Sequence, residues 1–245
     1  MTEDDAQKWL AEHFDVSRET WSKLEAFIEF LKAEAQQQNL ISASTMEHVW
    51  TRHIVDSAQL LQFAPSEPAN WIDLGSGAGF PGLVIALLSD WHVTLVESRA
   101  KRIDYLNRAI AQLRLESRVN VAGMPVERVE TQKFAVISAR AFAPLPKLLD
   151  LSARFSTDKT IWLLPKGRNA VNELEEARKA WELDFSVQPS VTDPEAGILT
   201  GTVREPRQIP PKRRNPGCWR KDGGRNDSDR HSEPERRRRK DDDGH

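Results

Sequence analysis

A glycine-dense loop between an apolar strand and a helix carries the residues best placed for chemistry. The segment reads Trp71-Ile72-Asp73-Leu74-Gly75-Ser76-Gly77-Ala78-Gly79-Phe80-Pro81-Gly82. Because glycine has no Cβ and reaches positive φ, a ligand can approach this backbone closely. The next predicted strand ends on Glu97, where a carboxylate can bind the hydroxyl groups of a ribose. The pattern predicts a pocket for a cofactor that contains a nucleoside.

Two registers of these glycines favour different cofactors. A dinucleotide requires G-x-G-x-x-G, with the last glycine close to a pyrophosphate at the start of the helix. Counting from Gly75 puts an aromatic residue at that position. Counting from Gly77 uses Gly79 and Gly82 but places the first glycine too far past the strand. The register that fits the strand end is Gly75-x-Gly77-x-Gly79 with Asp73 just ahead, which resembles the loop of S-adenosylmethionine methyltransferases.

Composition limits where a nucleic acid could bind. The 245 residues suffice for one large domain or two small ones. Lys and Arg total 35 and Asp and Glu total 37, which gives a net charge of −2. Residues 204–245 carry 14 basic and 9 acidic residues, so this tail has a charge of +5 and the body −7. An acidic body argues against RNA affinity spread over the whole fold, so any RNA contact is expected to be local.

The cysteine content and the apolar runs indicate the compartment. Cys218 is the only cysteine, which excludes intramolecular disulfides and thiolate metal clusters and suits a reducing environment. The first residues are acidic and lack the apolar core of a signal peptide. The longest apolar run, Leu83 to Leu88, is too short to cross a bilayer. We expect a cytoplasmic protein with no membrane partner.

Two helices are predicted in an N-terminal extension over residues 1–68. Ser17 can cap the first helix, whose apolar residues follow the i, i+3, i+4, i+7 spacing of a buried helical face: Leu24, Phe27, Ile28 and Leu31. The second is predicted from about Glu47 to Phe63, with Thr45 near its start and a buried side formed by Val49, Ile54 and Leu61. Two prolines, Pro65 and Pro68, close the extension.

Strands alternate with helices in a second region, residues 69–203. The predicted strands are Trp71 to Leu74, His92 to Glu97, Val119 to Ala122, Phe134 to Ala139 and Thr160 to Leu164. Helices are predicted over Gly82 to Leu88, over Lys101 to Leu115 and after the fourth and fifth strands. This alternation favours a parallel sheet covered on both faces. Phe185 to Val191 and Ile198 to Val203 are separated only by a turn, which predicts an antiparallel hairpin at the sheet edge.

The last region, residues 204–245, is rich in proline and charge and poor in apolar residues. Such a segment cannot bury enough surface to offset its ordering entropy, so we expect it to be disordered. Its run Arg236 to Lys240 could tether RNA, but the acidic residues that follow favour a solvated tail without a specific role.

Several separated motifs occur in a characteristic order between residues 17 and 203. They are Asn39-Leu40-Ile41-Ser42, the segment Arg52 to Ser57, the glycine loop, Val126-Glu127, the string Ser138 to Ala143 and Leu164-Pro165-Lys166-Gly167. On these motifs the chain resembles the 16S ribosomal RNA guanine-N7 methyltransferase family (RsmG/GidB). The implied fold is α/β, a Rossmann-like class I methyltransferase with a mostly parallel seven-stranded sheet, a C-terminal antiparallel hairpin and an N-terminal helical extension.

The resemblance also implies an activity and a set of contacts. The implied cofactor is S-adenosylmethionine, and the implied target is N7 of a guanine in 16S rRNA near the decoding site. The cofactor contacts that the family motifs imply are Gly75, Phe80, Val126, Glu127 and Arg140. The loop pattern adds Asp73, Gly77, Gly79 and Glu97 to this set. The implied partner is 16S rRNA or a small-subunit particle, and we expect a monomer.

Guanine N7 chemistry needs no catalytic acid or base. The N7 atom exposes an in-plane lone pair and carries no proton, so the enzyme mainly has to align the reactants and exclude water. Methyltransferases that act on exocyclic amines often carry Asp or Asn before Pro-Pro-aromatic after strand four, whereas this chain has Ser138-Ala139-Arg140-Ala141-Phe142. We therefore identify no catalytic residue. Arg140 could bind the cofactor carboxylate or a phosphate, or form a structural ion pair.

Basic residues at the strand ends are candidates for RNA contacts. Lys101, Arg102 and Lys166 follow predicted strands, so they should lie at the carboxyl edge of the sheet, where they could bind phosphates or be ordinary solvated charges. Arg52 and His53 could face the same edge from the extension, with a structural histidine as the alternative. The histidines show no metal-ligand spacing, so no metal is expected. Two other functions stay open: a nicotinamide-dependent oxidoreductase, and a noncatalytic RNA-associated protein that binds the cofactor.

Overall fold

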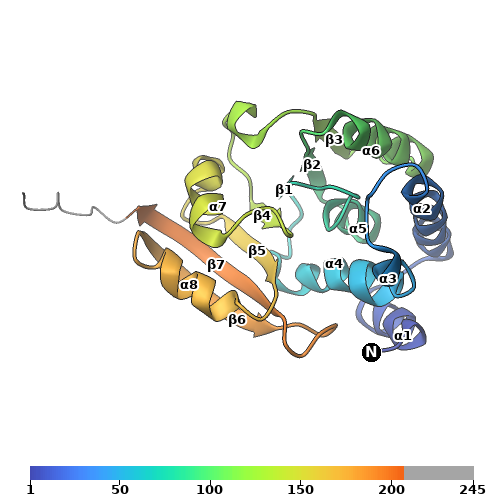
Figure 1. The fold of residues 1–245 in the computed structure, drawn as a ribbon, viewed down its shortest axis with the longest axis horizontal. Coiled ribbons are helices and arrows are strands. Elements are labelled where there is room, and N and C mark those ends of the chain that lie inside the picture. The colour runs from blue at the N-terminus through green and yellow to red at the C-terminus, as the bar shows by residue number, and fades with distance from the viewer. Residues whose placement is uncertain (207–245) are drawn as a thin grey trace, which may run out of the picture. The chain divides into compact units, whose positions relative to one another are not determined.

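The computed structural model describes residues 1–206, which fold around one seven-stranded sheet (Figure 1). The strands are β1 (Asn70–Leu74), β2 (His92–Val96), β3 (Val119–Ala122), β4 (Val136–Ala139), β5 (Ile161–Lys166), β6 (Trp181–Pro189) and β7 (Gly197–Pro206). Their order across the sheet is β3-β2-β1-β4-β5-β7-β6. Strands β1 to β5 are parallel, and β7 is antiparallel to both of its neighbours.

The predicted α/β fold with a C-terminal antiparallel hairpin is confirmed. The returning strand β7 lies between β5 and β6, so β6 forms the edge of the sheet. Strand β7 continues to Pro206, three residues past the predicted strand end. The remainder of the predicted disordered tail, residues 207–245, lies outside the described residues.

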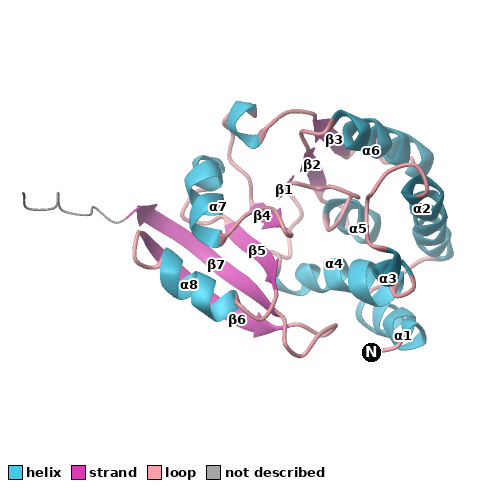
Figure 2. Cartoon of the chain, viewed as in Figure 1, coloured by secondary structure: helices cyan, strands magenta, loops and turns pink. Residues whose placement is uncertain are grey.

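Helices cover both faces of the sheet, as the alternation of strands and helices predicted (Figure 2). Helices α5 (Gly82–Leu88) and α6 (Ala100–Leu113) pack with the N-terminal extension on one face, and α7 (Leu145–Ser152) and α8 (Ala170–Ala177) pack on the other. Successive strand residues point to opposite faces of the sheet. Trp71 therefore packs in the core under α5, α6 and the extension, and Ile72 packs in the core under α7 and α8. No helix in the described part of the chain is long and apolar enough to span a membrane.

The N-terminal extension begins with a helix that the sequence did not predict, α1 (Glu3–His13). The Glu3 carboxylate accepts hydrogen bonds from the backbone N–H groups of Trp50 and Thr51, at 2.9 and 3.0 Å, and so ties α1 to the following helical segment. The next helix, α2 (Arg18–Ala35), confirms the predicted cap, because the Ser17 hydroxyl accepts from the Thr20 N–H at 3.1 Å.

The prediction of one continuous helix from Glu47 to Phe63 is wrong. The chain instead forms α3 (Ala43–Met46), the π-helix η1 (Trp50–Val55), α4 (Asp56–Ala58) and the 3₁₀-helix η2 (Gln59–Phe63). A π turn holds an extra residue, so it shifts the later side chains around the helix axis. Leu60 is accordingly fully buried, whereas Leu61, which was predicted to be buried, is only partly so. The same shift brings His53 and Asp56 to the carboxyl edge of the sheet.

Gly201 is required for the close packing of β7. Its φ is +156°, and a Cβ added there would lie 2.0 Å from the Asp184 carbonyl oxygen. We expect Gly201→Ala to lower the free energy of unfolding by about 2 kcal/mol or more, because the clashing atom belongs to the backbone and cannot rotate away. Urea unfolding followed by circular dichroism measures this. Gly167→Ala is the matched control, since a Cβ at Gly167 meets nothing within 4 Å; equal stability of the two variants would contradict this account.

Candidate functional site

The glycine loop folds back against the end of β2. Gly75, Gly77 and Gly79 adopt φ values of +71°, +58° and +92°, in the region that favours glycine. The N–H groups of Gly75 and Ser76 donate to the Val96 carbonyl at 2.9 and 3.0 Å. A Cβ on Gly75 would lie 2.5 Å from the Phe142 ring, so the bare backbone at this position is covered by an aromatic side chain from the segment after β4.

Asp73 stabilises the glycine loop through hydrogen bonds inside the protein core. Its carboxylate is fully buried and accepts hydrogen bonds from the Ser138 hydroxyl at 2.8 Å and from the Gly82 N–H at 3.3 Å. The Ser138 oxygen in turn accepts from the Trp71 indole N–H at 2.8 Å. Burial raises the pKa of Asp73 to about 6. Asp73 therefore joins β1, β4 and the start of α5, and it does not line a cavity.

Glu97 closes the other side of the loop. One carboxylate oxygen accepts from the backbone N–H groups of Ser98 and Arg99, at 2.7 and 2.9 Å, and the other accepts from the Gly77 N–H at 3.2 Å. The Arg102 guanidinium lies 3.7 Å from this second oxygen. Each oxygen of an ionised carboxylate has two lone pairs, so Glu97 retains acceptor capacity for ligand hydroxyls.

A cavity of about 240 Å³ opens between Glu97 and the loop, and we call it the smaller cavity. It is lined by Gly75, Val96, Glu97, Ser98, Arg99, Arg102, Met124, Pro125, Val126, Ala141 and Phe142. Apolar side chains form one wall and a carboxylate forms another, which fits the flat base and the ribose of a nucleoside. Phe142 covers the backbone at Gly75, whereas the backbone at Gly77 is more open, because a Cβ there would come no closer than 3.5 Å to another atom. The residues present therefore fit S-adenosylmethionine.

A second cavity, of about 660 Å³, adjoins the first, and we call it the larger cavity. The two share Ala141 and Phe142 as a common wall. Ala141 adopts φ +53°, which is unusual for a residue other than glycine and marks the turn that separates the cavities. Two ligands bound in the two cavities would thus meet at the segment that follows β4.

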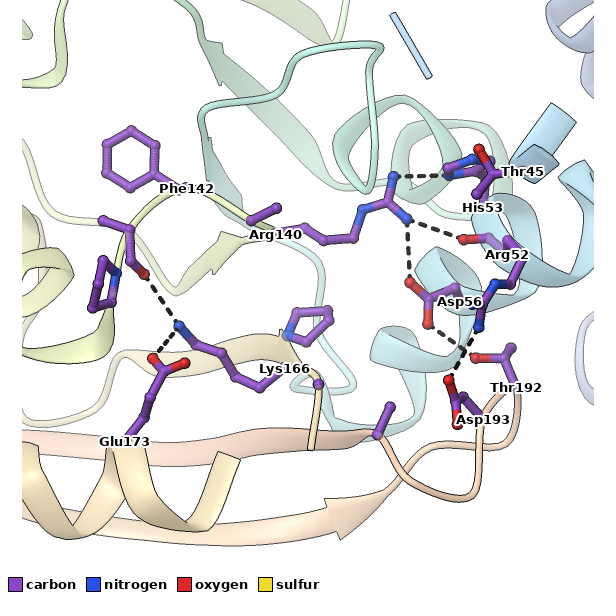
Figure 3. A pocket seen from close by; sticks show the side chains of 16 residues that line it. Thr45, Arg52, His53, Asp56, Arg140, Phe142, Lys166, Glu173, Thr192 and Asp193 are labelled. Atoms are coloured by element: carbon purple, nitrogen blue, oxygen red, sulfur yellow. Dashed lines mark hydrogen bonds and ion pairs between the residues drawn. The ribbon is translucent and has the colours of Figure 1, made fainter. Parts of the chain in front are cut away.

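Arg140 is the central cation of the larger cavity (Figure 3). Its guanidinium donates to the Arg52 carbonyl at 3.1 Å, to the Asp56 carboxylate at 3.3 Å and to Nδ1 of His53 at 3.0 Å. It also lies 5.2 Å from the centre of the Phe80 ring, on which His53 stacks at 4.8 Å. Burial, followed by the nearby Arg140 and Arg52 charges, lowers the pKa of His53 to about 3. His53 is therefore neutral at pH 7 and accepts a hydrogen bond from Arg140.

The other polar residues of the larger cavity are also paired. Lys166 donates to the Glu173 carboxylate at 2.8 Å and to the Ala143 carbonyl at 3.2 Å. Arg52 pairs with Asp193 at 3.1 Å. Figure 3 shows these pairs on opposite sides of the cavity, with the turn between β6 and β7 as one wall.

The structure separates the predicted cofactor contacts into three groups. Gly75, Glu97 and Val126 line the smaller cavity. Gly77 does not line it, but its N–H donates a hydrogen bond to Glu97, which does. Arg140 lines the larger cavity. The remaining residues line neither cavity: Asp73, Gly79, Phe80 and Glu127. Of these, Glu127 is exposed to solvent, and a Cβ on Gly79 would press on Leu83 of α5.

The predicted RNA contacts do not form one patch. Arg52, His53 and Lys166 line the larger cavity, and Arg102 lines the smaller one, bound to Glu97 and to the Asn39 carbonyl. Lys101 is exposed at the first turn of α6 and lines neither cavity.

Sequence reasoning missed several residues of the larger cavity. Asp56 was noted only as part of the Arg52 to Ser57 motif, whereas its carboxylate binds Arg140 and also accepts from the Thr192 hydroxyl at 3.0 Å. The spacing of Arg52 and Asp56, four residues apart on a helical segment, was a signal that both face the same way. Asp193 was interpreted only as part of a turn. Nothing in the local sequence connects it to a helix 141 residues earlier.

The strand order, the glycine loop and the carboxylate at the end of β2 define a class I methyltransferase. The family model described as rRNA small subunit methyltransferase G matches residues 20–198, and the chain belongs to this family. It is therefore a methyltransferase of small-subunit rRNA with S-adenosylmethionine as its cofactor, as the sequence predicted. Family membership also excludes the nicotinamide alternative, and a Cβ on Gly82 would indeed meet Leu95 and Asp73 rather than a ligand.

Named relatives are similar in sequence to this chain over most of its length. A protein named ribosomal RNA small subunit methyltransferase G from Sphingopyxis alaskensis is 54% identical over 210 residues, covering 85% of this chain and 88% of that protein. A protein of the same name from Zymomonas mobilis is 49% identical over 216 residues, covering 85% and 97%. A solved ribosomal protein L11 methylase from Lactobacillus delbrueckii shares the fold, with a TM-score of 0.51, 14% identity and coverage of 61% and 77%.

The raised pKa of Asp73 predicts a pH dependence of stability. Since its folded-state pKa of about 6 lies above the unfolded value of 3.8, its contribution to stability is fully present below pH 3.8 and is lost as pH rises through 6. Asp73→Asn removes this titration. We expect the unfolding free energy of the natural protein, relative to the variant, to fall by roughly 3 kcal/mol from about pH 4 to above about pH 6. Urea titrations across this range measure it, with the exposed Asp150→Asn as control; a flat difference would contradict the assignment.

The position of Glu97 predicts its effect on cofactor binding. Three of the four lone pairs of the Glu97 carboxylate already accept backbone N–H groups, which leaves one for a ribose hydroxyl. That hydrogen bond is charge-assisted, so we expect Glu97→Gln to weaken S-adenosylmethionine binding by about 10- to 100-fold. Isothermal titration calorimetry measures the Kd. Glu130→Gln, at an exposed residue that lines neither cavity, is the control. The unfolding temperature is measured in parallel, because Glu97 also holds three backbone N–H groups. An unchanged Kd in a folded variant would refute the role.

Proposed function

We propose that this enzyme transfers the methyl group of S-adenosylmethionine to N7 of a guanine in 16S rRNA near the decoding site. The observation that carries the proposal is that every carboxylate lining the larger cavity is bound to a cation: Asp56 to Arg140, Glu173 to Lys166 and Asp193 to Arg52. His53 is neutral, but its Nδ1 lone pair is engaged by Arg140. These groups are poorly placed to remove a proton from a substrate.

A nucleophile that needs no deprotonation suits such a site. Guanine N7 has an in-plane lone pair and no hydrogen, whereas an exocyclic amine must lose a proton during transfer. The cofactor, when bound, supplies an electrophilic methyl group on a positively charged sulfur. The chain then has to hold the base in line with that methyl and keep water out, which requires shape rather than acid or base groups. The shared wall at Ala141 and Phe142 is where this alignment would occur.

We propose a role for each predicted cofactor contact, and for all but Glu127 its position supports that role. Glu97 binds the ribose, Val126 packs against the base, and the backbone at Gly75 and Gly77 passes next to the methionine part. Asp73 and Gly79 do not touch the cofactor but hold the glycine loop against α5. Phe80 supports the Arg140 guanidinium, which lies over its ring. Arg140 holds the segment after β4 between the two cavities. Glu127 is exposed and lines neither cavity, so its role as a cofactor contact rests on the family motif alone.

The proposal extends to the form of the enzyme. We propose that the enzyme acts as a monomer, which is consistent with both cavities being lined by residues of a single chain. Its substrate is 16S rRNA, alone or within a small-subunit particle, and its compartment is the cytoplasm.

Replacing the target atom tests the proposal directly. In RNA that carries 7-deazaguanine, a carbon stands where N7 would be, so we expect no transfer to the substituted residue. Unmodified RNA of the same sequence should be methylated at one guanine. Labelled S-adenosylmethionine quantifies the transfer, and mass spectrometry of nuclease fragments locates the methyl group.

Two outcomes would reject the proposal. Equal labelling of the 7-deazaguanine RNA would show that another atom is the acceptor. Binding of RNA and cofactor with no transfer to either RNA would favour the noncatalytic alternative.

A further inference from the structure

Two cations of the larger cavity are held in partly buried ion pairs. The side chains of Arg140 and Asp56 are 21% and 18% exposed, and those of Lys166 and Glu173 are 12% and 29% exposed. Each cation also donates to a backbone carbonyl. Separating such a pair leaves a desolvated charge without a partner, which is costly. These two pairs are therefore part of the wall and are poorly suited to bind a new anion.

Two further cations beside the cavity are paired differently. The side chains of Arg52 and Asp193 are 48% and 33% exposed, and those of Arg168 and Glu195 are 77% and 56% exposed, so both pairs are more open to solvent. The arginines come from distant elements, η1 and the loop after β5, whereas both carboxylates belong to the single turn between β6 and β7. Exposed ion pairs contribute only about 0 to 1 kcal/mol, so an incoming anion can exchange with them at little cost.

The base of this turn is fixed independently of the two exposed pairs. The Gln59 side chain accepts from the Val191 N–H at 3.0 Å, and the Asp56 carboxylate accepts from the Thr192 hydroxyl at 3.0 Å. The tip has its own internal bond, from the Glu195 N–H to the Asp193 carboxylate at 3.0 Å. The Glu195 N–H, followed by the Arg52 side chain, holds the pKa of Asp193 below its ordinary value, so this carboxylate is charged at pH 7. The tip can release both arginines while its base stays attached. Asp193 then keeps the hydrogen bond from the Glu195 N–H, the main cause of its lowered pKa, so it stays a poor base.

A carboxylate bound to a guanidinium occupies the place that a phosphate would take, because arginine presents the same planar set of donors to both. We propose that Arg52 and Arg168 form a binding site for RNA phosphates at the mouth of the larger cavity, and that Asp193 and Glu195 occupy it until RNA displaces them. This inference rests on the proposed RNA substrate. It adds Arg168 to the predicted RNA contacts. It also assigns Lys166, which was one of them, a structural role in the cavity wall.

Salt-dependent binding of unmethylated small-subunit RNA, measured by fluorescence anisotropy without cofactor, tests the proposal. Each phosphate contact contributes about 0.7 to 0.9 to the slope of log K against log salt, so Arg52→Gln and Arg168→Gln should each reduce the slope by roughly that amount. Arg168→Lys should keep it. The double variant Asp193→Asn with Glu195→Gln should bind about three- to tenfold more tightly, because the competing carboxylates are gone.

Glu29→Gln is the matched control for the acidic residues, since Glu29 forms an exposed pair with Lys32 on α2, away from either cavity. Thermal unfolding confirms that each variant is folded. Unchanged slopes in both arginine variants, or a double acidic variant that binds no more tightly than Glu29→Gln, would overturn the proposal. The result is separable from the proposed function: altered slopes together with methylation at an atom other than N7 would reject only the latter.

Discussion

One guanidinium connects the N-terminal extension to the sheet. Arg140 leaves the end of β4 and binds a carbonyl, a carboxylate and an imidazole, all from the segment between Arg52 and Asp56. The same group lies over Phe80, so the glycine loop is held in the same arrangement. The larger cavity exists because these contacts fix the extension at the carboxyl edge of the sheet, where a bare α/β core would leave an open surface.

Two carboxylates with opposite environments shape the smaller cavity. Asp73 is surrounded by protein and accepts hydrogen bonds from groups that belong to β4 and α5, which makes it a support. Glu97 is bound mainly by backbone N–H groups at the cavity itself, which leaves it able to receive further donors. They lie at the ends of neighbouring strands and both are buried, but only Glu97 lines the smaller cavity, which separates a ligand-binding role from a structural one.

Local features of this chain could be predicted from sequence, whereas contacts between distant segments could not. The strands were found because their apolar runs are bounded by glycine, proline and charged residues, and Gly75 and Glu97 are recognisable within one β-α-β stretch. The pairing of Arg140 with Asp56 joins residues 84 positions apart, and it depends on a π turn that apolar periodicity does not reveal. Helix α1 was missed because it buries only Ala6 and Leu10 and so has a weak pattern.

The insertion of β7 between β5 and β6 has a consequence for biosynthesis. Until residues 197–206 leave the ribosome, β6 has no neighbour in the sheet and the outer edge of β5 is unpaired. The wall formed by the turn before β7 is also incomplete at that stage. Vectorial synthesis can thus assemble the glycine loop early, but the sheet of the described residues is complete only when β7 arrives.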